Sequence, residues 1–299
     1  MLRTLSSQAA ISIDNARLYG NLEALNRSYT RFVPHEFLEI LGKSSILSVE
    51  LGDQVARDMS VLFSDIKGFT RLSESMSPGE NIQFINDYLH WMEPVLHRNQ
   101  GFIDKYIGDA IMALFPRSAE DAVRAALHML EELRHFNQVR AGRGEEPVAI
   151  SIGINTGSLM LGVVGGADRL DTTVISDAVN LASRVEHLTR LYGVSLLITE
   201  YTWSQLPQGD RDFSNIRKID RVIPKGKSTA VDLYEVFSAD DPGVCRLKAE
   251  TLREFDIARD FFHCGRFPEA ARGFREILER NPDDHVARHY AGRCTTAVA

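Results

Sequence analysis

Two strand-like segments, each carrying one carboxylate, decide the fold of this chain. They are Met59-Ser-Val-Leu-Phe-Ser-Asp65-Ile-Lys-Gly-Phe-Thr70 and Asp104-Lys-Tyr-Ile-Gly-Asp109-Ala-Ile-Met-Ala-Leu-Phe115. Asp65 closes an apolar run, and the Lys67-Gly68 turn behind it is predicted to leave backbone N–H groups free. Asp109 follows Gly108 between two apolar runs, as expected at the tip of a β-hairpin. If the two strands are neighbours, both carboxylates meet at one end of the sheet.

This pairing predicts a site for a divalent cation that carries a polyphosphate. Carboxylate oxygens are ligands that Mg²⁺ prefers, and the amides of a tight turn bind phosphate oxygens. A single Asp at such a place is more commonly a turn or cap residue. Two of them at the same sheet end reverse that preference.

The composition places limits on the partners and the compartment. The chain has 299 residues, of which 44% are hydrophobic and 25% charged, as in an ordinary globular protein that can hold more than one folded unit. A net charge of -7 argues against nucleic acid as the main partner. The three cysteines show no CxxC spacing, which predicts reduced thiols. No apolar run reaches the length of a membrane span and no signal peptide is recognised, so we expect a cytoplasmic protein.

The chain divides into four segments: residues 1–19, 20–50, 51–240 and 245–299. In the third segment, strands are joined both by hairpins and by helical crossovers, which predicts an α+β fold with helices packed on a mixed sheet. The expected elements are strand 59–66, helix 79–98, hairpin 102–115, helix 119–138, strand 148–154, strand 159–164, strand-to-helix unit 172–191, strand 195–199 and strand pair 216–237.

The first two segments favour a coiled coil. Apolar residues fall on alternating three- and four-residue steps, with Asn15 at the one polar seam position, and this favours a parallel two-stranded partner. The seam residues are Ile11, Leu18, Leu22, Leu25, Tyr29 and Phe32. A helix packed on its own domain is the alternative.

The last segment is predicted to be helical. The spacing of Gly265, Phe267, Ala270 and Pro282 resembles one tetratricopeptide repeat. Because a single repeat cannot bury its apolar face alone, we expect this tail to dock on something or to be truncated.

Four motifs together resemble the class III nucleotidyl cyclases. They are Phe63-Ser-Asp-Ile-Lys-Gly-Phe-Thr-Arg71, Lys105-Tyr-Ile-Gly-Asp-Ala-Ile-Met-Ala113, Ile154-Asn-Thr-Gly157 and Val174-Ile-Ser-Asp-Ala-Val-Asn-Leu-Ala-Ser-Arg184. The resemblance covers about residues 51–240. It implies a ferredoxin-like βαββαβ core and the conversion of a nucleoside triphosphate into a 3′,5′-cyclic monophosphate and pyrophosphate. It also implies catalytic sites at the interface of a head-to-tail dimer.

The resemblance assigns the metal and phosphate residues. Asp65 and Asp109 match the metal-bridging pair, the Ile66 carbonyl is the expected backbone ligand, and two Mg²⁺ or Mn²⁺ ions are expected per active site. The turn amides from Lys67 onward are expected to hold phosphate oxygens, and the residues concerned are Gly68, Phe69 and Thr70. Lys225 matches the triphosphate-binding loop that precedes the last strand.

The resemblance also assigns the residues that read the base and stabilise the transition state. Asn180 and Arg184 are four apart on one helix face. They match the pair in which Asn orients the ribose and Arg stabilises the charge that builds on the α-phosphate. Lys105 aligns with the base-reading Lys of adenylyl cyclases, and an ammonium can only donate, which suits adenine N1. Thr173, seven before Asn180, aligns with the partner of the adenine amino group.

The resulting prediction is an adenylate cyclase that acts on ATP as a homodimer with shared active sites. Residues 5–19 resemble the last helix of GAF sensor domains, so an upstream sensor is expected. Ser176 departs from the family pattern, where Gly is usual. The general base stays open between Asp65, a phosphate oxygen and water. The alternatives are a guanylate or relaxed-specificity cyclase, an inactive nucleotide-binding regulator, and a scaffold dominated by the tail.

Overall fold

The structure is a computed structural model that describes residues 2–29, 34–166, 169–207, 209, 213–223 and 229–298; side chains at 2–11, 26–29 and 297–298 are not described. It forms two compact units. Residues 1–55 and 161–173 make up the first unit, and residues 56–160 and 174–299 the second.

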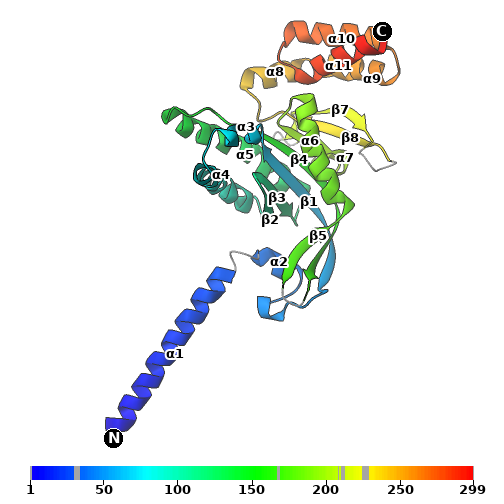
Figure 1. Cartoon of the computed structure of the whole chain (residues 1–299). Coiled ribbons are helices and arrows are strands. Elements are labelled where there is room, and N and C mark those ends of the chain that lie inside the picture. The colour runs from blue at the N-terminus through cyan, green and yellow to red at the C-terminus, as the bar shows by residue number, and fades with distance from the viewer. Residues whose placement is uncertain are drawn as a thin grey trace. The chain divides into compact units, whose positions relative to one another are not determined.

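The chain contains a mixed sheet of the predicted α+β class (Figure 1). Residues 54–55, 161–165 and 170–173 of its strands belong to the first unit, and its other residues belong to the second. Its strand order is β2-β3-β1-β4-β6-β8-β7, with β5 paired to β4. The order β2-β3-β1-β4, with helical crossovers between β1 and β2 and between β3 and β4, is the ferredoxin-like βαββαβ arrangement expected for the core. The strands are β1 (Gln54–Ile66), β2 (Phe102–Ile107), β3 (Ala110–Phe115), β4 (Ile150–Gly165), β5 (Leu170–Ile175), β6 (Leu196–Thr199), β7 (Ile216–Val222) and β8 (Val231–Val236).

Helices cover both faces of this sheet. Alternation along β6 shows the division: Leu196 and Ile198 join the core under α4 (Pro78–Arg98) and α5 (Ala119–Gly142), whereas Leu197 joins the core under α6 (Asp177–Tyr192). The α4 crossover begins at a capping box in which Ser77 accepts from the Glu80 amide, with Pro78 at the first helical position. The short helices α3 (Phe69–Glu74) and α7 (Glu200–Trp203) follow β1 and β6.

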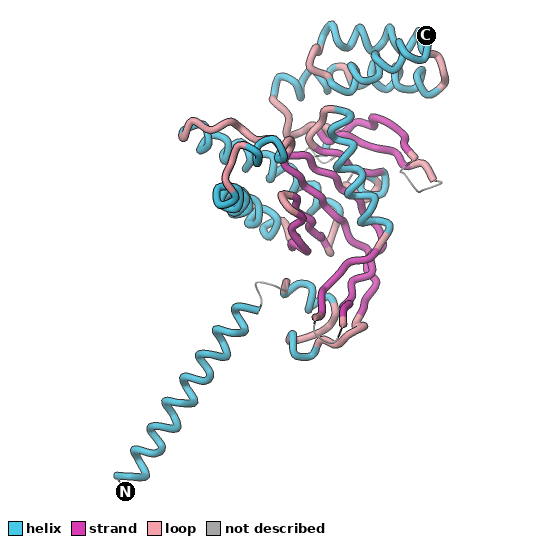
Figure 2. The backbone as a smooth tube through the Cα atoms, in the orientation of Figure 1, coloured by secondary structure: helices cyan, strands magenta, loops and turns pink. Residues whose placement is uncertain are grey.

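One prediction about the strands is wrong. We expected separate strands at 148–154 and 159–164, but β4 runs without interruption from Ile150 to Gly165 and is among the long strands of Figure 2. Asn155 and Thr156 look like turn residues in the sequence, yet both side chains are buried and hydrogen-bonded. The Asn155 amide donates to the Ala178 carbonyl (3.0 Å), and the Thr156 hydroxyl lies 2.7 Å from that of Ser60. These partners satisfy the polar groups inside the sheet, so the chain does not turn outward.

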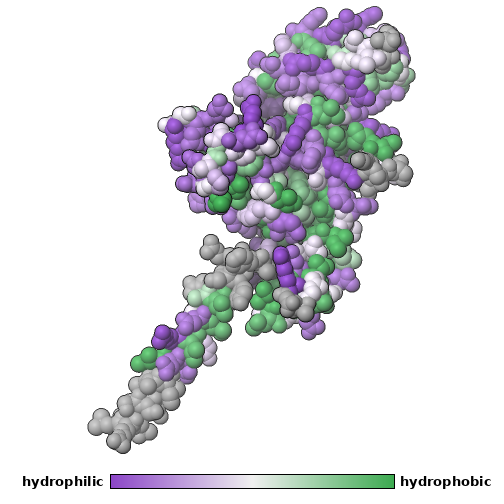
Figure 3. Space-filling view, viewed as in Figure 1, coloured by the Kyte–Doolittle hydropathy of each residue, from purple (hydrophilic) through white to green (hydrophobic). Residues whose placement is uncertain are grey.

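The C-terminal helices dock on the sheet of their own chain, as one of the two expectations for the tail required. They are α8 (Pro242–Glu250), α9 (Leu252–His263), α10 (Phe267–Arg280) and α11 (His285–Val298). Phe255, Phe274 and Tyr290 share a core with Leu181 and Tyr192 of α6. The outward side of these helices in Figure 3 is mainly hydrophilic, which agrees with an apolar side turned to the sheet. The likeness to a tetratricopeptide repeat stays a prediction.

The first unit begins with α1 (Leu2–Tyr29), so the predicted N-terminal helix is present. The side chains of Leu18, Leu22 and Leu25 are exposed on it. The other predicted seam side chains, Ile11, Tyr29 and Phe32, lie outside the described residues. The unit continues with α2 (His35–Ile40) and a short 3-10 helix, η1 (Ile46–Ser48), and it places residues 52–53 beside Val163 through two backbone hydrogen bonds. None of the helices, over the residues described, combines the length and apolar character that crossing a bilayer requires.

Candidate active site

The structure brings Asp65 and Asp109 together. β1 and β3 pair antiparallel with Ser64 opposite Ile111, so Asp65 at the end of β1 lies beside the start of β3. Ile107 pairs with Ala110, which leaves Gly108 and Asp109 as the two-residue tip of the β2–β3 hairpin. Gly108 adopts φ 65°, a left-handed conformation that glycine accepts without strain. The predicted meeting of the two strands at one sheet end is therefore confirmed.

The electrostatics of this pair suit a cation. Burial, followed by the hydrogen bond and the repulsion from Asp65, raises the pKa of Asp109 from the ordinary 3.8 to about 6. Its Oδ2 atom is buried and accepts no hydrogen bond within the described part of the chain. A buried acceptor without a donor, next to a second carboxylate, is the arrangement that a divalent cation stabilises. The donor set present thus fits the expected metal.

The remaining ligands of such an ion must come from other kinds of oxygen. Across the described ranges, no three His, Cys, Asp or Glu side chains gather where they could share a metal ion. Backbone carbonyls, such as that of Ile66, and phosphate oxygens of a substrate are the available alternatives. The N–H of Ile66 already donates to the Asp109 carboxylate, so this residue lies at the site.

One residue at this site, Arg190 of α6, was not predicted from the sequence. Its guanidinium pairs with the Asp65 carboxylate; 50% of the Arg190 side chain is exposed, against 20% for Asp65. Glu186 and Arg190 are four apart, a spacing that predicts only a pair on the helix surface. Indeed, Arg190 also lies 4.0 Å from the buried Glu186 carboxylate. The contact with Asp65 depends on the packing of α6 on the sheet, which no local pattern reveals.

The turn after Asp65 differs from the expectation at its first residue. The Lys67 amide was predicted to be free, but it donates to the Ala149 carbonyl (2.8 Å). Its ammonium donates to the Val194 carbonyl (3.0 Å), and burial lowers the pKa of this side chain. Gly68, with φ 73°, precedes α3, and the amides of Gly68, Phe69 and Thr70 have no acceptor among the residues described. The amides left for an anion therefore begin at Gly68.

Helix α6 is held close to the sheet at one glycine and begins at a side-chain cap. Ser176 caps it: the hydroxyl accepts from the Ala178 amide (3.0 Å) and donates to the Ser158 carbonyl (2.6 Å). Thus the departure from the usual Gly supplies a cap. A Cβ atom on Gly153 would lie 2.1 Å from the Glu186 backbone nitrogen, so only glycine allows α6 to approach β4 this closely.

The two predicted catalytic residues of α6 form no polar contact with the carboxylate pair. Asn180 is exposed and Arg184 is half-buried. Among the described residues, neither side chain forms a hydrogen bond or ion pair, whereas Arg190 of the same helix pairs with Asp65. The structure of one chain brings together the predicted metal ligands but not the predicted transition-state residues.

The remaining predicted residues have these positions. Lys105 lies on β2 and pairs with Asp104 at 3.4 Å, with 40% of its side chain exposed. Thr173 lies on β5, within the first unit, and is half-buried. Lys225 lies outside the described residues.

Comparison with known proteins identifies the class of this fold and site. The family model of the adenylate and guanylate cyclase catalytic domain matches residues 52–235. The chain belongs to this family, as the resemblance of its motifs predicts.

Individual relatives include enzymes named for either base. An adenylate cyclase of Anabaena cylindrica is 42% identical over 234 residues, covering 76% of this chain and 45% of that protein. The terminal-differentiation specific adenylate cyclase of Dictyostelium discoideum is 37% identical over 280 residues, covering 91% of this chain and 13% of that protein. The crystal structure of the guanylyl cyclase Cya2 superposes with a TM-score of 0.54 at 32% identity, covering 64% of this chain and 97% of that one.

Two features of these matches bear on the chain as a whole. This chain spans less than half the length of the two curated relatives. The match with the Dictyostelium protein leaves out less than a tenth of this chain, so it extends beyond the family domain on both sides. Part of the C-terminal helices is therefore included in that similarity.

Proposed function

We propose that this chain cyclises ATP to 3′,5′-cyclic AMP and releases pyrophosphate. The observation that carries the proposal is the meeting of Asp65 and Asp109 at one sheet end, with an unpartnered buried carboxylate oxygen. The family match and the two relatives named adenylate cyclase support it. An inactive regulator is disfavoured because both carboxylates and Arg184 are retained.

In this proposal Asp65, Asp109 and the Ile66 carbonyl hold two divalent cations, Mg²⁺ or Mn²⁺. When bound, such ions make the ribose 3′-hydroxyl more acidic and neutralise charge on the leaving phosphates. The amides of Gly68, Phe69 and Thr70 donate to phosphate oxygens. Lys225 is assigned to the triphosphate on the resemblance alone.

The α6 residues act on the reacting phosphorus and the ribose. Arg184 donates to the α-phosphate oxygens, where negative charge increases in the transition state, and Asn180 orients the ribose. A fixed planar guanidinium in this position stabilises the transition state more than the ground state. Lys lacks the planar set of donors of a guanidinium, so an Arg184→Lys chain is expected to be inactive.

Lys105 and Thr173 favour ATP over GTP. The Lys105 ammonium donates to adenine N1, which is an acceptor, whereas guanine N1 carries a proton. Thr173 accepts from or donates to the exocyclic group at position 6 of the base. A relaxed or guanylate specificity is the alternative, and it has a solved guanylyl cyclase among the similar structures.

We infer a homodimer in which each active site takes its metal ligands from one copy and Asn180 and Arg184 from the other. Two observations support this: neither α6 residue forms a polar contact with the carboxylate pair of its own chain, and apolar side chains are exposed beside the pair. Tyr106 and Ile107, at the end of β2, are 46% and 51% exposed. A second copy would cover them.

Helix α1 is assigned to signal input. Its exposed leucines suit a parallel coiled coil with the same helix of a second copy, and the longer relatives leave room for an upstream sensor. Deletion of residues 1–50 tests this: the expected result is weaker dimerisation by sedimentation and a changed basal rate. If both were unchanged, α1 would have no part in assembly or signalling.

The central experiment compares turnover of ATP and GTP with Mg²⁺ and with Mn²⁺, identifying the products by chromatography. Wild type is expected to form cyclic AMP and to prefer ATP, and Asp109→Ala to form none. Asp58→Ala, which removes an exposed carboxylate from β1, the strand that carries Asp65, is the matched control and should keep its activity. Cyclic GMP as the main product would overturn the assignment of Lys105 and Thr173 to adenine. Turnover by Asp109→Ala would overturn the assignment of Asp109 to the metal.

Shared sites are tested by mixing two inactive variants. When Asp65→Ala and Arg184→Ala chains are coexpressed and allowed to exchange subunits, we expect heterodimers with one intact site. Activity should then reach about a quarter of wild type if chains mix at random, since half of the dimers carry one of two sites. Continued inactivity of a mixture that is shown to contain heterodimers would contradict the arrangement.

A further inference from the structure

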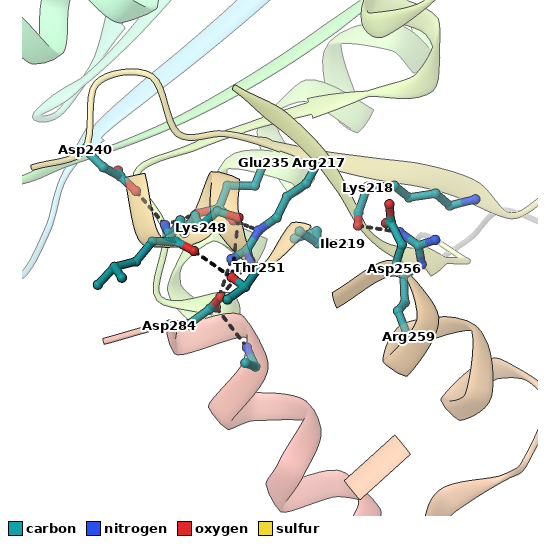
Figure 4. A network of polar contacts seen from close by, with 12 residues as sticks. Arg217, Lys218, Ile219, Glu235, Asp240, Lys248, Thr251, Asp256, Arg259 and Asp284 are labelled. Carbon is teal, nitrogen blue, oxygen red and sulfur yellow. Dashed lines mark hydrogen bonds and ion pairs between the residues drawn. The ribbon is translucent and has the colours of Figure 1, made fainter. Parts of the chain in front are cut away.

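A buried ion network joins the C-terminal helices to the sheet (Figure 4). Arg217 of β7 is fully buried and donates through both terminal nitrogens to Asp284, at 2.7 and 2.8 Å. Its remaining nitrogen donates to Glu235 of β8 (2.6 Å), which also accepts from Lys248 of α8 (2.6 Å). Two helices of the tail are thereby tied to two neighbouring strands.

The network contains two cations and three carboxylates, and each cation contacts two of them. Arg217 donates to Asp284 and Glu235. Lys248 donates to Glu235 and to Asp240, the latter at 2.5 Å. Burial alone would raise the pKa of Asp284, but Arg217 outweighs burial and holds that pKa below its ordinary value. Removing one member leaves buried charge without a partner, which is far more disruptive than losing an exposed ion pair. The Arg217–Asp284 fork therefore fixes where α11 begins.

Asp284 also sets the first turn of α11. Its Oδ1 atom accepts from the Ala287 amide (3.0 Å), as a side-chain cap does. The next residue, His285, lies against Gly193, the glycine with φ 68° that ends α6. A Cβ on Gly193 would lie 2.8 Å from the His285 Cβ. The start of α11 thus rests on the end of α6, where opposite ends of two helix dipoles meet.

Further contacts extend this junction along α6. The Tyr192 hydroxyl donates to Asp220 of β7 (2.5 Å), and the ring of His289 packs edge-on against Tyr192 with centroids 5.2 Å apart. Val185 and Leu181, nearer the start of α6, belong to the same core as Phe255 and Tyr290 of the tail. Arg184 lies between these two buried positions in the sequence, so the helix turn that carries the residue assigned to the transition state also contributes to the core shared with the tail.

We propose that α8–α11 are a fixed part of the catalytic domain and that Asp284 is a positioning residue, which holds α6 in register through Arg217 and the contact of His285 with Gly193. The consequence for turnover rests on the proposed function; the consequence for α6 itself does not. The tail would then support α6 of its own chain and would need no outside partner. A misplacement of about 1 Å in a group that acts on the transition state lowers a rate by about a hundredfold.

The test uses the full chain with Asp284→Asn, a replacement of equal size that keeps an oxygen for the Ala287 amide. Asp283→Asn, on the exposed neighbouring residue, is the matched control. Hydrogen exchange is measured for α6 and for the β2–β3 hairpin, and kcat and KM for ATP are measured separately. We expect faster exchange in α6 with the hairpin unchanged, and a kcat reduced about tenfold or more with KM within about twofold.

Several outcomes would overturn the proposal. Faster exchange in α8–α11 with α6 unchanged would make the tail an independent appendage. A kcat equal to that of Asp283→Asn would remove any role in positioning. If Asp284→Asn does not fold, Tyr290→Phe replaces it, since that change keeps the ring and removes the hydroxyl, which donates to the Ile219 carbonyl (2.8 Å) and interacts with Asp220. For Tyr290→Phe, hydrogen exchange in α6 equal to that of wild type would also refute the proposal. If wild type makes no cyclic nucleotide, the proposed function fails, and hydrogen exchange alone decides the role of the tail.

Discussion

Asp109→Asn should make the metal-free protein more stable while abolishing its proposed activity. In wild type, Asp109 is half-buried beside Asp65, and its pKa rises from 3.8 to about 6. That shift corresponds to about 3 kcal/mol at about 1.4 kcal/mol per pKa unit. Because solvent reaches part of the side chain, screening reduces the cost of burying this charge beside Asp65 to about 1 kcal/mol. An Asn side chain removes it and still accepts from the Ile66 amide.

The raised pKa of Asp109 determines how the stability difference between wild type and Asp109→Asn changes with pH. A raised pKa means that the folded chain binds the proton more tightly than the unfolded chain. The destabilisation of wild type is therefore complete above pH 6, declines as the pH falls through 6, and is absent below 3.8. The stability advantage of Asp109→Asn should be present at pH 7.5 and should disappear near pH 4.

The assay is thermal unfolding with EDTA and, in parallel, with Mn²⁺. In EDTA at pH 7.5 the variant should melt about 2 °C above wild type, as about 1 kcal/mol implies for a chain of this size. Mn²⁺ at about a hundred times its Kd should stabilise wild type by about 2.7 kcal/mol and leave the variant nearly unchanged. Asp58→Asn, on the exposed part of β1, controls for the change in net charge. An Asp109→Asn protein less stable than wild type in EDTA would refute the reasoning.

Three further variants probe the same region. Arg190→Gln removes the guanidinium that competes with a cation for its carboxylate partner; an exposed pair is worth about 0.2–1 kcal/mol, so Mn²⁺ measured by calorimetry should bind about 1.4–5 times more tightly. Gly153→Ala places a Cβ 2.1 Å from the α6 backbone, so urea unfolding should show a loss of about 3 kcal/mol. Lys105→Glu with Thr173→Cys should lower the ratio of kcat/KM for ATP to that for GTP by about a hundredfold or more.

Each of these has a control and a contrary outcome. Arg253→Gln removes an exposed charge of the same sign from α9, and weaker Mn²⁺ binding by Arg190→Gln would mean that the guanidinium orients its carboxylate for the metal. Gly142→Ala lies at the end of α5 with open space around the added Cβ and should cost little. If Lys105→Glu with Thr173→Cys leaves the preference for ATP over GTP unchanged, other residues recognise the purine.

The sequence predicted the structure best where a feature depends on residues that are close together in the chain. The hairpin tip at Gly108 and Asp109 is set by local turn chemistry, and the apolar run before Asp65 marks a buried strand, so their meeting could be predicted. The division of β4 into two strands was wrong because Asn155 and Thr156 have turn-forming character locally. Their partners, Ala178 and Ser60, come from distant segments, and only the folded sheet brings them near.

The rest of the site could not be predicted from the sequence because it depends on contacts between elements that are far apart in the chain. The Lys67 amide could be assigned to the turn but not to its acceptor, Ala149, which belongs to the segment before β4. Arg190 followed the helical spacing from Glu186, and nothing in that spacing points to Asp65. The docking of the tail was expected in general terms, whereas Arg217 and Asp284, 67 positions apart, show no joint pattern in the sequence.

The anchoring of α6 explains why the site of one chain is divided as it is. Gly153 lets the helix lie against β4, and its last turn meets α11, so α6 has little freedom to swing toward the carboxylate pair. Arg190 reaches Asp65 from this position, while Arg184, six residues earlier, lies about 9 Å away along the helix axis at 1.5 Å per residue. In the homodimer that we propose, Arg184 acts on a phosphate held by Asp65 and Asp109 of the other copy. The rigid anchoring of α6 within its own chain would then present Arg184 accurately to that copy.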